Sequence, residues 1–238
     1  MTAPNLALSE LCSRVSKLSF EELSELSGEE LTGIQTVLAE AAYDKLDAKC
    51  SQDPLYWAQN HSATENPHWK EQGLPFIAPF PEKPYFRVLF EAFLSANRLF
   101  IPKSREMLTS WCTMCYATHR SQWAKAEVVV QTAKEDKACR LVEYAAILYR
   151  NQADWLKKRH PLKRQTSLSL EWEDGGRLYG IPGGEDQIRM FHPTIVIFDE
   201  AAFLPGAEAC YNAANPVAKQ IVAISSAAPG WFADQCAL

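Results

Sequence analysis

The chain has 238 residues, is 47% hydrophobic and carries a formal net charge of −5, so it can bury the core of one sizeable domain. No apolar run approaches the roughly 18 residues that a transmembrane helix requires, and the first ten residues lack the basic start and apolar centre of a signal peptide. Seven cysteines at irregular spacing fit a reducing compartment better than a disulfide framework. These properties argue against membrane and secreted classes and predict a cytoplasmic protein.

Residues 1–50 are acidic, with nine acids against four bases, whereas the remaining residues hold twenty of each. Ser19 and Glu22 have the spacing of a helix-capping box. Gly28 and Gly33 are expected to interrupt the helix that follows. Its apolar positions recur at helical spacings: Leu23, Leu26, Leu31, Ile34, Val37 and Leu38. We predict an acidic helical N-terminal segment, and the neutral remainder argues against nucleic-acid binding through bulk charge.

Residues 51–84 are rich in prolines and aromatic side chains, which excludes long helices and predicts an ordered strap over the core. The aromatic residues are expected to anchor the strap, although one of them could instead stack on an adenine ring. These residues are Trp57, Trp69, Phe76, Phe80 and Tyr85.

Residues 85–119 have the layout of a phosphate-binding unit. A helix over 85–96 is followed by a short strand over 97–102, a tight polar loop, and a helix over 108–119. Loop N–H groups and the helix N-terminus would point at an anion, and the Ser110 hydroxyl would complete a Mg²⁺ shell.

The loop departs from the usual phosphate-loop pattern G-x-x-x-x-G-K-[ST]. With Ser110 at the last position, Lys103 and Leu108 fall where the glycines belong and Thr109 where the lysine belongs. Lys103 and Arg105 stand at the loop entrance, from which a long cationic side chain could fold back over the phosphates. The predicted nucleotide-binding residues are Lys103, Ser104, Arg105, Glu106, Met107, Leu108, Thr109 and Ser110.

Cys112, Cys115 and His119 recur on one face of the helix that follows the loop. A zinc site normally needs a fourth ligand, and the sequence offers no second C-x-x-C pair. We therefore favour buried small side chains over a metal site.

The middle of the chain alternates strand and helix patterns. Residues 126–132 form a predicted strand and 134–156 a long helix, before a basic run at 157–164. That run is either a solvated connection or a contact for a phosphate backbone. The segments 167–172 and 177–181 flank E-D-G-G, which indicates a hairpin, and a glycine loop bearing Arg189 follows.

The segment F-H-P-T-I-V-I-F-D-E-A-A-F, residues 191–203, contains the most informative pattern. Its apolar run predicts a strand covered on both faces, and Asp199 and Glu200 would emerge at its carboxyl end. Asp199 could hold Mg²⁺ and Glu200 could orient and deprotonate an attacking water. Alternatively, the segment is a buried strand that ends in solvated charges.

A helix after Phe203 and a second buried strand complete the chain. This strand, Q-I-V-A-I-S-S, ends in Ser225 and Ser226, whose hydroxyls could bond the attacking water or the γ-phosphate, or could only pack.

The ordered motifs K-S-R-E-M-L-T-S-W, I-P-G-G, I-V-I-F-D-E-A-A-F and A-I-S-S-A-A-P together resemble the ATPase domain of the large terminase subunit of tailed bacteriophages. The resemblance covers residues 51–238. It implies an α/β fold of the P-loop NTPase type (ASCE-like), with a mainly parallel sheet and helices on both faces, plus the N-terminal helical segment of residues 1–50. No nuclease domain is expected.

The resemblance also implies roles for residues. Ser110 and Asp199 would hold Mg²⁺, Glu200 would be the catalytic carboxylate, and Arg189 would be either an arginine finger for a neighbouring subunit or a surface ion-pair partner. The coupling motif would be Ser225, Ser226 and Ala227.

The implied activity is ATP hydrolysis that drives double-stranded DNA into procapsids in the host cytoplasm. The implied partners are DNA, a portal protein and a small terminase subunit, with a homo-oligomeric ring as the active form and no membrane. The alternatives are a helicase-like DNA translocase unrelated to packaging and a nucleotide-binding interaction module without turnover.

Overall fold

The computed structural model describes residues 28–237 and divides the chain into two compact units, Met1–Gln52 and Asp53–Leu238. The described part of the first unit is one helix, α3 (Gly28–Gln52), which continues through Gly33. The expected interruption at Gly33 is therefore wrong, because one glycine costs a helix interior only about 1 kcal/mol. The predicted capping box at Ser19 and Glu22 lies outside the described residues.

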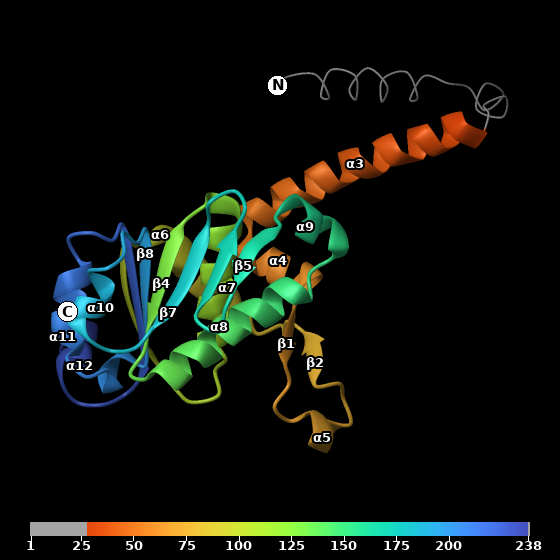
Figure 1. Cartoon of the computed structure of the whole chain (residues 1–238). Helices are drawn as coiled ribbons and strands as arrows, with labels where there is room; N and C mark the ends of the chain where they lie inside the picture. Colours follow the sequence, from red (N-terminus) through yellow and green to blue (C-terminus); the bar gives the residue numbers. More distant parts are fainter. Residues whose placement is uncertain (1–27, 238) are drawn as a thin grey trace. The chain divides into compact units, whose positions relative to one another are not determined.

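The second unit is built on a seven-stranded sheet (Figure 1). Its strand order is β3 (Arg98–Lys103), β9 (Gln220–Ser226), β8 (Ile195–Asp199), β4 (Glu127–Gln131), β7 (Arg177–Ile181), β6 (Ser169–Trp172) and β5 (Leu162–Gln165). The first five strands are parallel to one another. At the β7 side of the sheet, β6 runs antiparallel to β7, and β5 runs antiparallel to β6. The predicted mainly parallel sheet and the hairpin around E-D-G-G are both confirmed.

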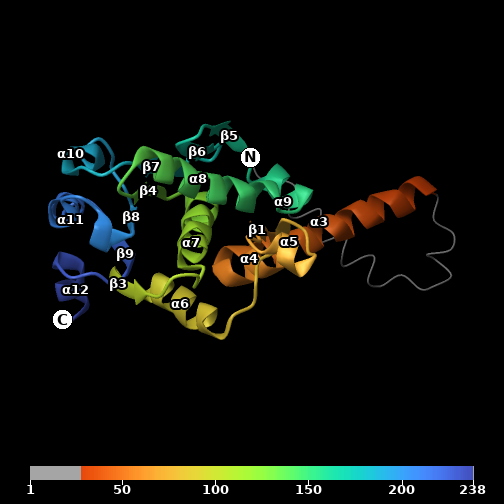
Figure 2. The ribbon, with the colours of Figure 1, turned by 90° about the horizontal axis from the view of Figure 1, so that it is seen from below.

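Helices cover both faces of this sheet (Figure 2). On one face lie α7 (Thr109–Ala124) and α8 (Glu135–Arg150); on the other lie α10 (Glu185–Ile188), α11 (Ala207–Ala214) and α12 (Trp231–Cys236). Val196 and Phe198 of β8 pack in the cluster that contains Cys210 of α11. Because side chains alternate along a strand, Ile195 and Ile197 point to the opposite face. The continuous apolar run of β8 therefore contributes side chains to the packing on both faces of the sheet.

The strap consists of α4 (Pro54–His61), β1 (Ala63–Glu65), α5 (Trp69–Gln72) and β2 (Ile77–Pro79), and α6 (Pro84–Ser95) follows. Trp57 and Phe80 are buried as predicted. Trp69 and Phe76 are instead 39% and 45% exposed and contact each other edge to face. They are not anchors: both lie in the segment that joins β1 to β2, and Figure 1 shows this hairpin with α5 projecting away from the sheet.

The predicted helix over 134–156 is interrupted. It ends at Arg150, and a second helix, α9 (Asp154–Arg159), follows. The buried Gln152 lies in the break, where its amide accepts a hydrogen bond from Trp57 Nε1 at 3.1 Å and exchanges two with Gln122. The basic run therefore divides between the end of α9 and β5, and is not a plain connection.

Gly180 of β7 determines how closely α8 lies on the sheet. A Cβ at this position would be 2.7 Å from Val142 Cγ2 and 3.0 Å from the Ala138 carbonyl oxygen, both on α8. A side chain at this position would force α8 to move away from β7, so glycine permits the close approach.

In the part of the chain that the structure describes, none of the helices combines the length and the apolar character needed to cross a bilayer.

Candidate active site

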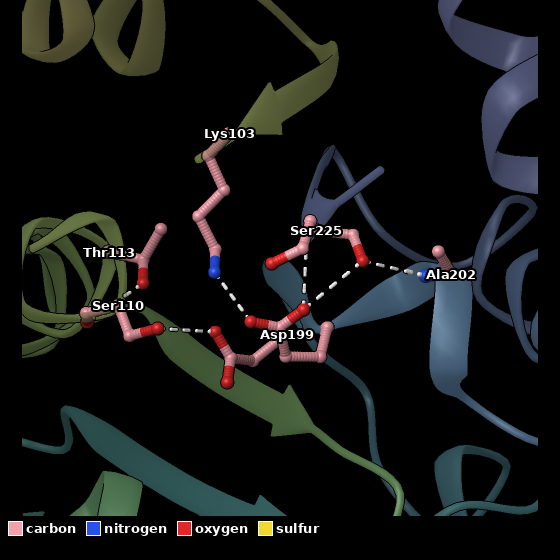
Figure 3. Close-up of polar contacts among 8 residues, drawn as sticks. Lys103, Ser110, Thr113, Asp199, Ala202 and Ser225 are labelled. Atoms are coloured by element: carbon pink, nitrogen blue, oxygen red, sulfur yellow. Dashed lines mark hydrogen bonds and ion pairs between the residues drawn. The ribbon is translucent and has the colours of Figure 1, made fainter. Parts of the chain in front are cut away.

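The candidate site lies where β3, β8 and β9 end. Lys103 is the last residue of β3 and pairs with Ser226 of β9, while Asp199 ends β8 beside Ile224 of β9. Because these strands are parallel, their carboxyl ends meet at one edge, where α/β proteins bind ligands. Side chains more than 90 positions apart in the sequence are thereby brought together (Figure 3).

Ser110 and Asp199 meet directly. The Ser110 hydroxyl, in the first turn of α7, donates a hydrogen bond to Asp199 Oδ1 at 2.8 Å. A hydroxyl and a carboxylate are hard oxygen ligands of the kind Mg²⁺ prefers. The described residues contain no group of three or more His, Cys, Asp or Glu side chains suited to a metal. Mg²⁺ at this point would therefore take its remaining ligands from water and phosphate oxygens, as is usual in nucleotide sites.

Glu200 is held by several donors. Its Oε1 lies 2.5 Å from Lys103 Nζ, and its Oε2 accepts hydrogen bonds from the Ser226 N–H at 3.1 Å and from Ser225 Oγ at 3.3 Å. Burial opposes ionisation, but the Lys103 ammonium and these hydrogen bonds outweigh it and lower the pKa of Glu200. The carboxylate is therefore ionised near neutral pH.

The backbone at Glu200 is strained, with φ of 53° in the left-handed region. For a non-glycine residue this conformation costs on the order of 1 kcal/mol, and it concentrates at functional sites. The turn begins the short 3₁₀ helix η1 (Ala201–Phe203), whose Ala202 N–H donates to Ser225 Oγ at 3.1 Å. Ser225 thus connects Glu200 with the segment that follows it.

The pKa of Asp199 is shifted in the opposite direction to that of Glu200. Its side chain is buried, and burial raises the pKa of Asp199 from its ordinary 3.8 to about 6, assisted by the neighbouring Glu200 charge. The Ser110 hydrogen bond and the Lys103 and Lys137 charges oppose this rise. A divalent cation would reverse it by favouring the ionised form.

The raised pKa of Asp199 predicts a pH-dependent stability in metal-free protein. Because the folded-state pKa is above the ordinary value, the contribution of Asp199 is complete below about pH 4 and is lost as pH rises through about 6. Asp199→Asn should be close to the wild type in stability below about pH 4 and exceed its free energy of unfolding by about 3 kcal/mol at pH 8. Denaturant titrations without Mg²⁺ at both pH values measure this difference.

Added Mg²⁺ should then stabilise the wild type at pH 8 but not Asp199→Asn. The exposed Asp234 provides the control, since Asp234→Asn should show neither effect. A variant Asp199→Asn that is less stable than wild type at pH 8 would contradict the assignment.

The loop between β3 and α7 forms its turn without glycine. Glu106 and Leu108 both have positive φ, 64° and 53°, and Leu108 is the position where the usual phosphate-loop pattern has glycine. The turn is held from outside the loop by Tyr85, whose hydroxyl donates to the Met107 carbonyl at 3.1 Å. The sequence departs from the pattern, but the backbone still adopts the left-handed conformation there.

The predicted loop residues differ in position. Lys103 and Ser110 reach the acidic pair, whereas the side chains of Ser104, Arg105 and Glu106 are exposed. Among the described residues, Arg105 has no ion-pair partner. A pocket of about 290 Å³ opens beside the loop; Ser104 and Arg105 are not part of its lining. It is lined by Lys103, Glu106, Met107, Leu108, Thr109, Ser110, Trp111, Glu65, Pro67, Arg140 and Tyr144.

Arg189 is not brought to this site within the chain. It caps the C-terminus of α10, is 60% exposed, and contacts Asp186 at 3.1 Å and Glu185 at 3.8 Å on its own helix. Ala227 is exposed and lines a separate pocket beside α12.

Cys112, Cys115 and His119 are buried in α7. Burial raises the pKa values of both thiols, and Cys115 Sγ lies 3.7 Å from the Pro54 carbonyl oxygen. The cysteines act as small side chains in helix packing.

The parallel core, the strand β9 between β3 and β8, and the loop-to-helix turn after β3 define a mainly parallel α/β fold with helices on both faces. The sequence matches no protein-family model, and no curated protein is similar to it in sequence.

Three solved structures are similar to this chain, and the first of them shares its fold. The large terminase of bacteriophage HK97 has a TM-score of 0.53 at 9% identity, over 74% of this chain and 37% of that chain. The large terminase ATPase domain of Thermus phage P74-26 has a TM-score of 0.49 at 14% identity, over 72% and 73% of the two chains. A mutant of that domain has a TM-score of 0.47 at 16% identity, over 72% and 74%.

The expected structural resemblance to large terminases is thus confirmed at the level of the fold. The match spans little more than a third of the HK97 chain, and at 9% identity it establishes architecture and not activity.

Sequence reasoning missed several residues beside the loop. It gave no role to Glu65, Arg140 or Tyr144, which line the pocket. Arg140 and Tyr144 are four residues apart, so they share one face of α8, but only the packing of α8 beside α7 directs that face to the loop.

Proposed function

We propose that the chain is a Mg²⁺-dependent ATPase that drives the translocation of double-stranded viral DNA into procapsids, as the ATPase part of a terminase large subunit. The convergence of Lys103, Ser110, Asp199 and Glu200 at one sheet edge supports this proposal most directly. The fold shared with the HK97 large terminase supports the packaging role.

In this mechanism each side chain has a separate task. The loop N–H groups and Lys103 bind the β- and γ-phosphates, while Ser110 and Asp199 hold Mg²⁺, which neutralises the developing phosphate charge. Glu200, ionised and held by Ser225 and Ser226, orients and deprotonates the attacking water. The side chains of Ser104, Arg105 and Glu106 line the outer side of the triphosphate.

Lys103 must leave Glu200 when it binds phosphate, so nucleotide binding frees the general base. Ser225 and Ser226 contact Glu200 at the end of β9, and Ser225 also contacts η1; these contacts support a coupling role for both serines. Ala227, the next residue, is proposed to belong to the same coupling segment. The active form is a homo-oligomeric ring in the host cytoplasm that works with a portal protein and a small terminase subunit.

Arg189 is proposed to act on the ATP of the neighbouring subunit. Its exposure at the end of α10 suits a finger supplied in trans. Arg189→Ala and Glu200→Gln should each be inactive alone, yet a mixture should regain Mg²⁺-dependent hydrolysis, because some interfaces would combine an intact Glu200 with an intact Arg189. ATP turnover is measured against protein concentration, with and without linear double-stranded DNA.

Wild-type activity should rise more steeply than linearly with protein concentration and require Mg²⁺. A mixture that is no more active than the sum of its parts would exclude the finger in trans. An absence of Mg²⁺-dependent turnover in the wild type at every concentration, with DNA present, would exclude the motor.

A further inference from the structure

The pocket beside the phosphate loop is also lined by side chains from outside the loop. Besides Lys103 and loop residues, its lining includes Arg140 and Tyr144 of α8 and Glu65 and Pro67 of the strap. Its volume of about 290 Å³ is just below the roughly 300–1,000 Å³ typical of small-molecule sites. A triphosphate held by the loop would have these four side chains beside it.

The pocket lining contains stacked planar groups. Trp111 and Tyr144 stack with centroids 4.0 Å apart and planes inclined by 16°. The Arg140 guanidinium lies over the Tyr144 ring, with Cζ 4.9 Å from its centroid. Because Trp111 and Arg140 already contact this ring, the half-exposed guanidinium plane is the surface offered to a nucleobase, and Tyr144 supports it.

The pocket lining also contains a hydrogen-bond acceptor, the Glu65 carboxylate. The Glu65 carboxylate is only 11% exposed and forms an ion pair with Arg140, which is 50% exposed. Both carboxylate oxygens offer several acceptor sites, so the ion pair leaves acceptor capacity for an exocyclic amino group of a base.

We propose that the face formed by Glu65, Arg140 and Tyr144 binds the purine base of the nucleotide, with Arg140 stacking on the ring and Glu65 accepting from its amino group. The proposal rests on the proposed function, because the phosphates must occupy the adjoining loop. In this proposal the base does not stack on an aromatic residue of the strap, since neither Trp69 nor Phe76 lines this pocket.

Arg140→Lys is the informative variant, because lysine retains the charge and can pair with Glu65 but lacks the planar stacking surface. The full chain would be titrated calorimetrically with Mg²⁺ and a non-hydrolysable ATP analogue, and separately with Mg²⁺ and inorganic tripolyphosphate. We expect Arg140→Lys to weaken binding of the ATP analogue about fivefold and to leave tripolyphosphate binding unchanged.

Arg87→Ala is the matched control, because Arg87 also forms an ion pair, with Asp53 at 2.9 Å, is 54% exposed and is not in the pocket lining. It should change neither affinity. Tyr144→Leu, which keeps the apolar volume but removes the ring, should reproduce the selective loss, and Glu65→Gln should weaken the ATP analogue but not the corresponding inosine triphosphate analogue.

The possible failures can be distinguished. If Arg140→Lys weakens the affinity for both ligands equally, Arg140 contacts the phosphates and the proposed base site is wrong. Unchanged affinities in Arg140→Lys and Tyr144→Leu would overturn the base site while the phosphate site stands. A wild type that binds neither ligand would overturn the proposed function together with this inference.

Discussion

Glu200→Gln should lower ATP turnover by about 10²- to 10⁴-fold, the usual contribution of a positioned general base. Glutamine keeps the shape of the side chain and can still accept hydrogen bonds from the Ser226 N–H and Ser225 Oγ, but it cannot take a proton from water. Single-turnover hydrolysis and calorimetric titration of the same samples separate the chemical step from binding.

Nucleotide affinity should be equal to or tighter than that of the wild type. In the wild type the triphosphate competes with Glu200 for Lys103, whose Nζ lies 2.5 Å from the carboxylate, and the amide is a weaker competitor. Glu208→Gln, at an exposed position in α11, is the matched control and should leave turnover unchanged. A clear loss of affinity in Glu200→Gln would show that the carboxylate serves binding and not hydrolysis.

Lys103→Ala should lower turnover by about 10²- to 10³-fold, as expected when a preorganised cation is removed from the developing charge. Arg105→Ala, two residues away, should lower turnover less than about fivefold. The reason is position: the Lys103 side chain is 10% exposed and already within the site, whereas Arg105 points to solvent. Comparing turnover of Lys103→Ala and Arg105→Ala shows which of the two cations replaces the lysine that is missing from the usual place in the loop.

Steady-state turnover and nucleotide affinity measured for both variants test this ranking. Lys103→Ala should also weaken Mg²⁺–ATP binding by at least about tenfold, because a charge-assisted contact to phosphate is lost. If Arg105→Ala proves the more damaging change, the loop must rearrange on binding so that Arg105 displaces Lys103 from the phosphates.

Local sequence patterns predicted β8, β9 and the other strands of the parallel core, together with the location of the acidic pair, but not β1, β2 or β5. A run such as Ile195 to Phe198 is apolar on both sides, so it can only be stable between two helical layers, and the residues that follow must emerge at the sheet edge. The E-D-G-G turn likewise constrained its hairpin locally.

Which of these residues contact each other depends on long-range packing. The pairing of Lys103 with Glu200 depends on β9 lying between β3 and β8, a strand order that no local pattern specifies. The left-handed turn at Leu108 likewise departs from what its side chain favours locally, and a contact from Tyr85 to the neighbouring Met107 helps to hold it.

The lining of the loop pocket shows most clearly the difference between what a local pattern predicts and what depends on tertiary packing. Arg140 and Tyr144 look like ordinary surface positions of an amphipathic helix, and they line the loop pocket because α8 packs beside α7, whose first turn follows the loop. Periodicity shows which face of a helix is apolar, since burial repeats with the helical turn. It does not show what the other face adjoins, because that depends on contacts between residues distant in the chain.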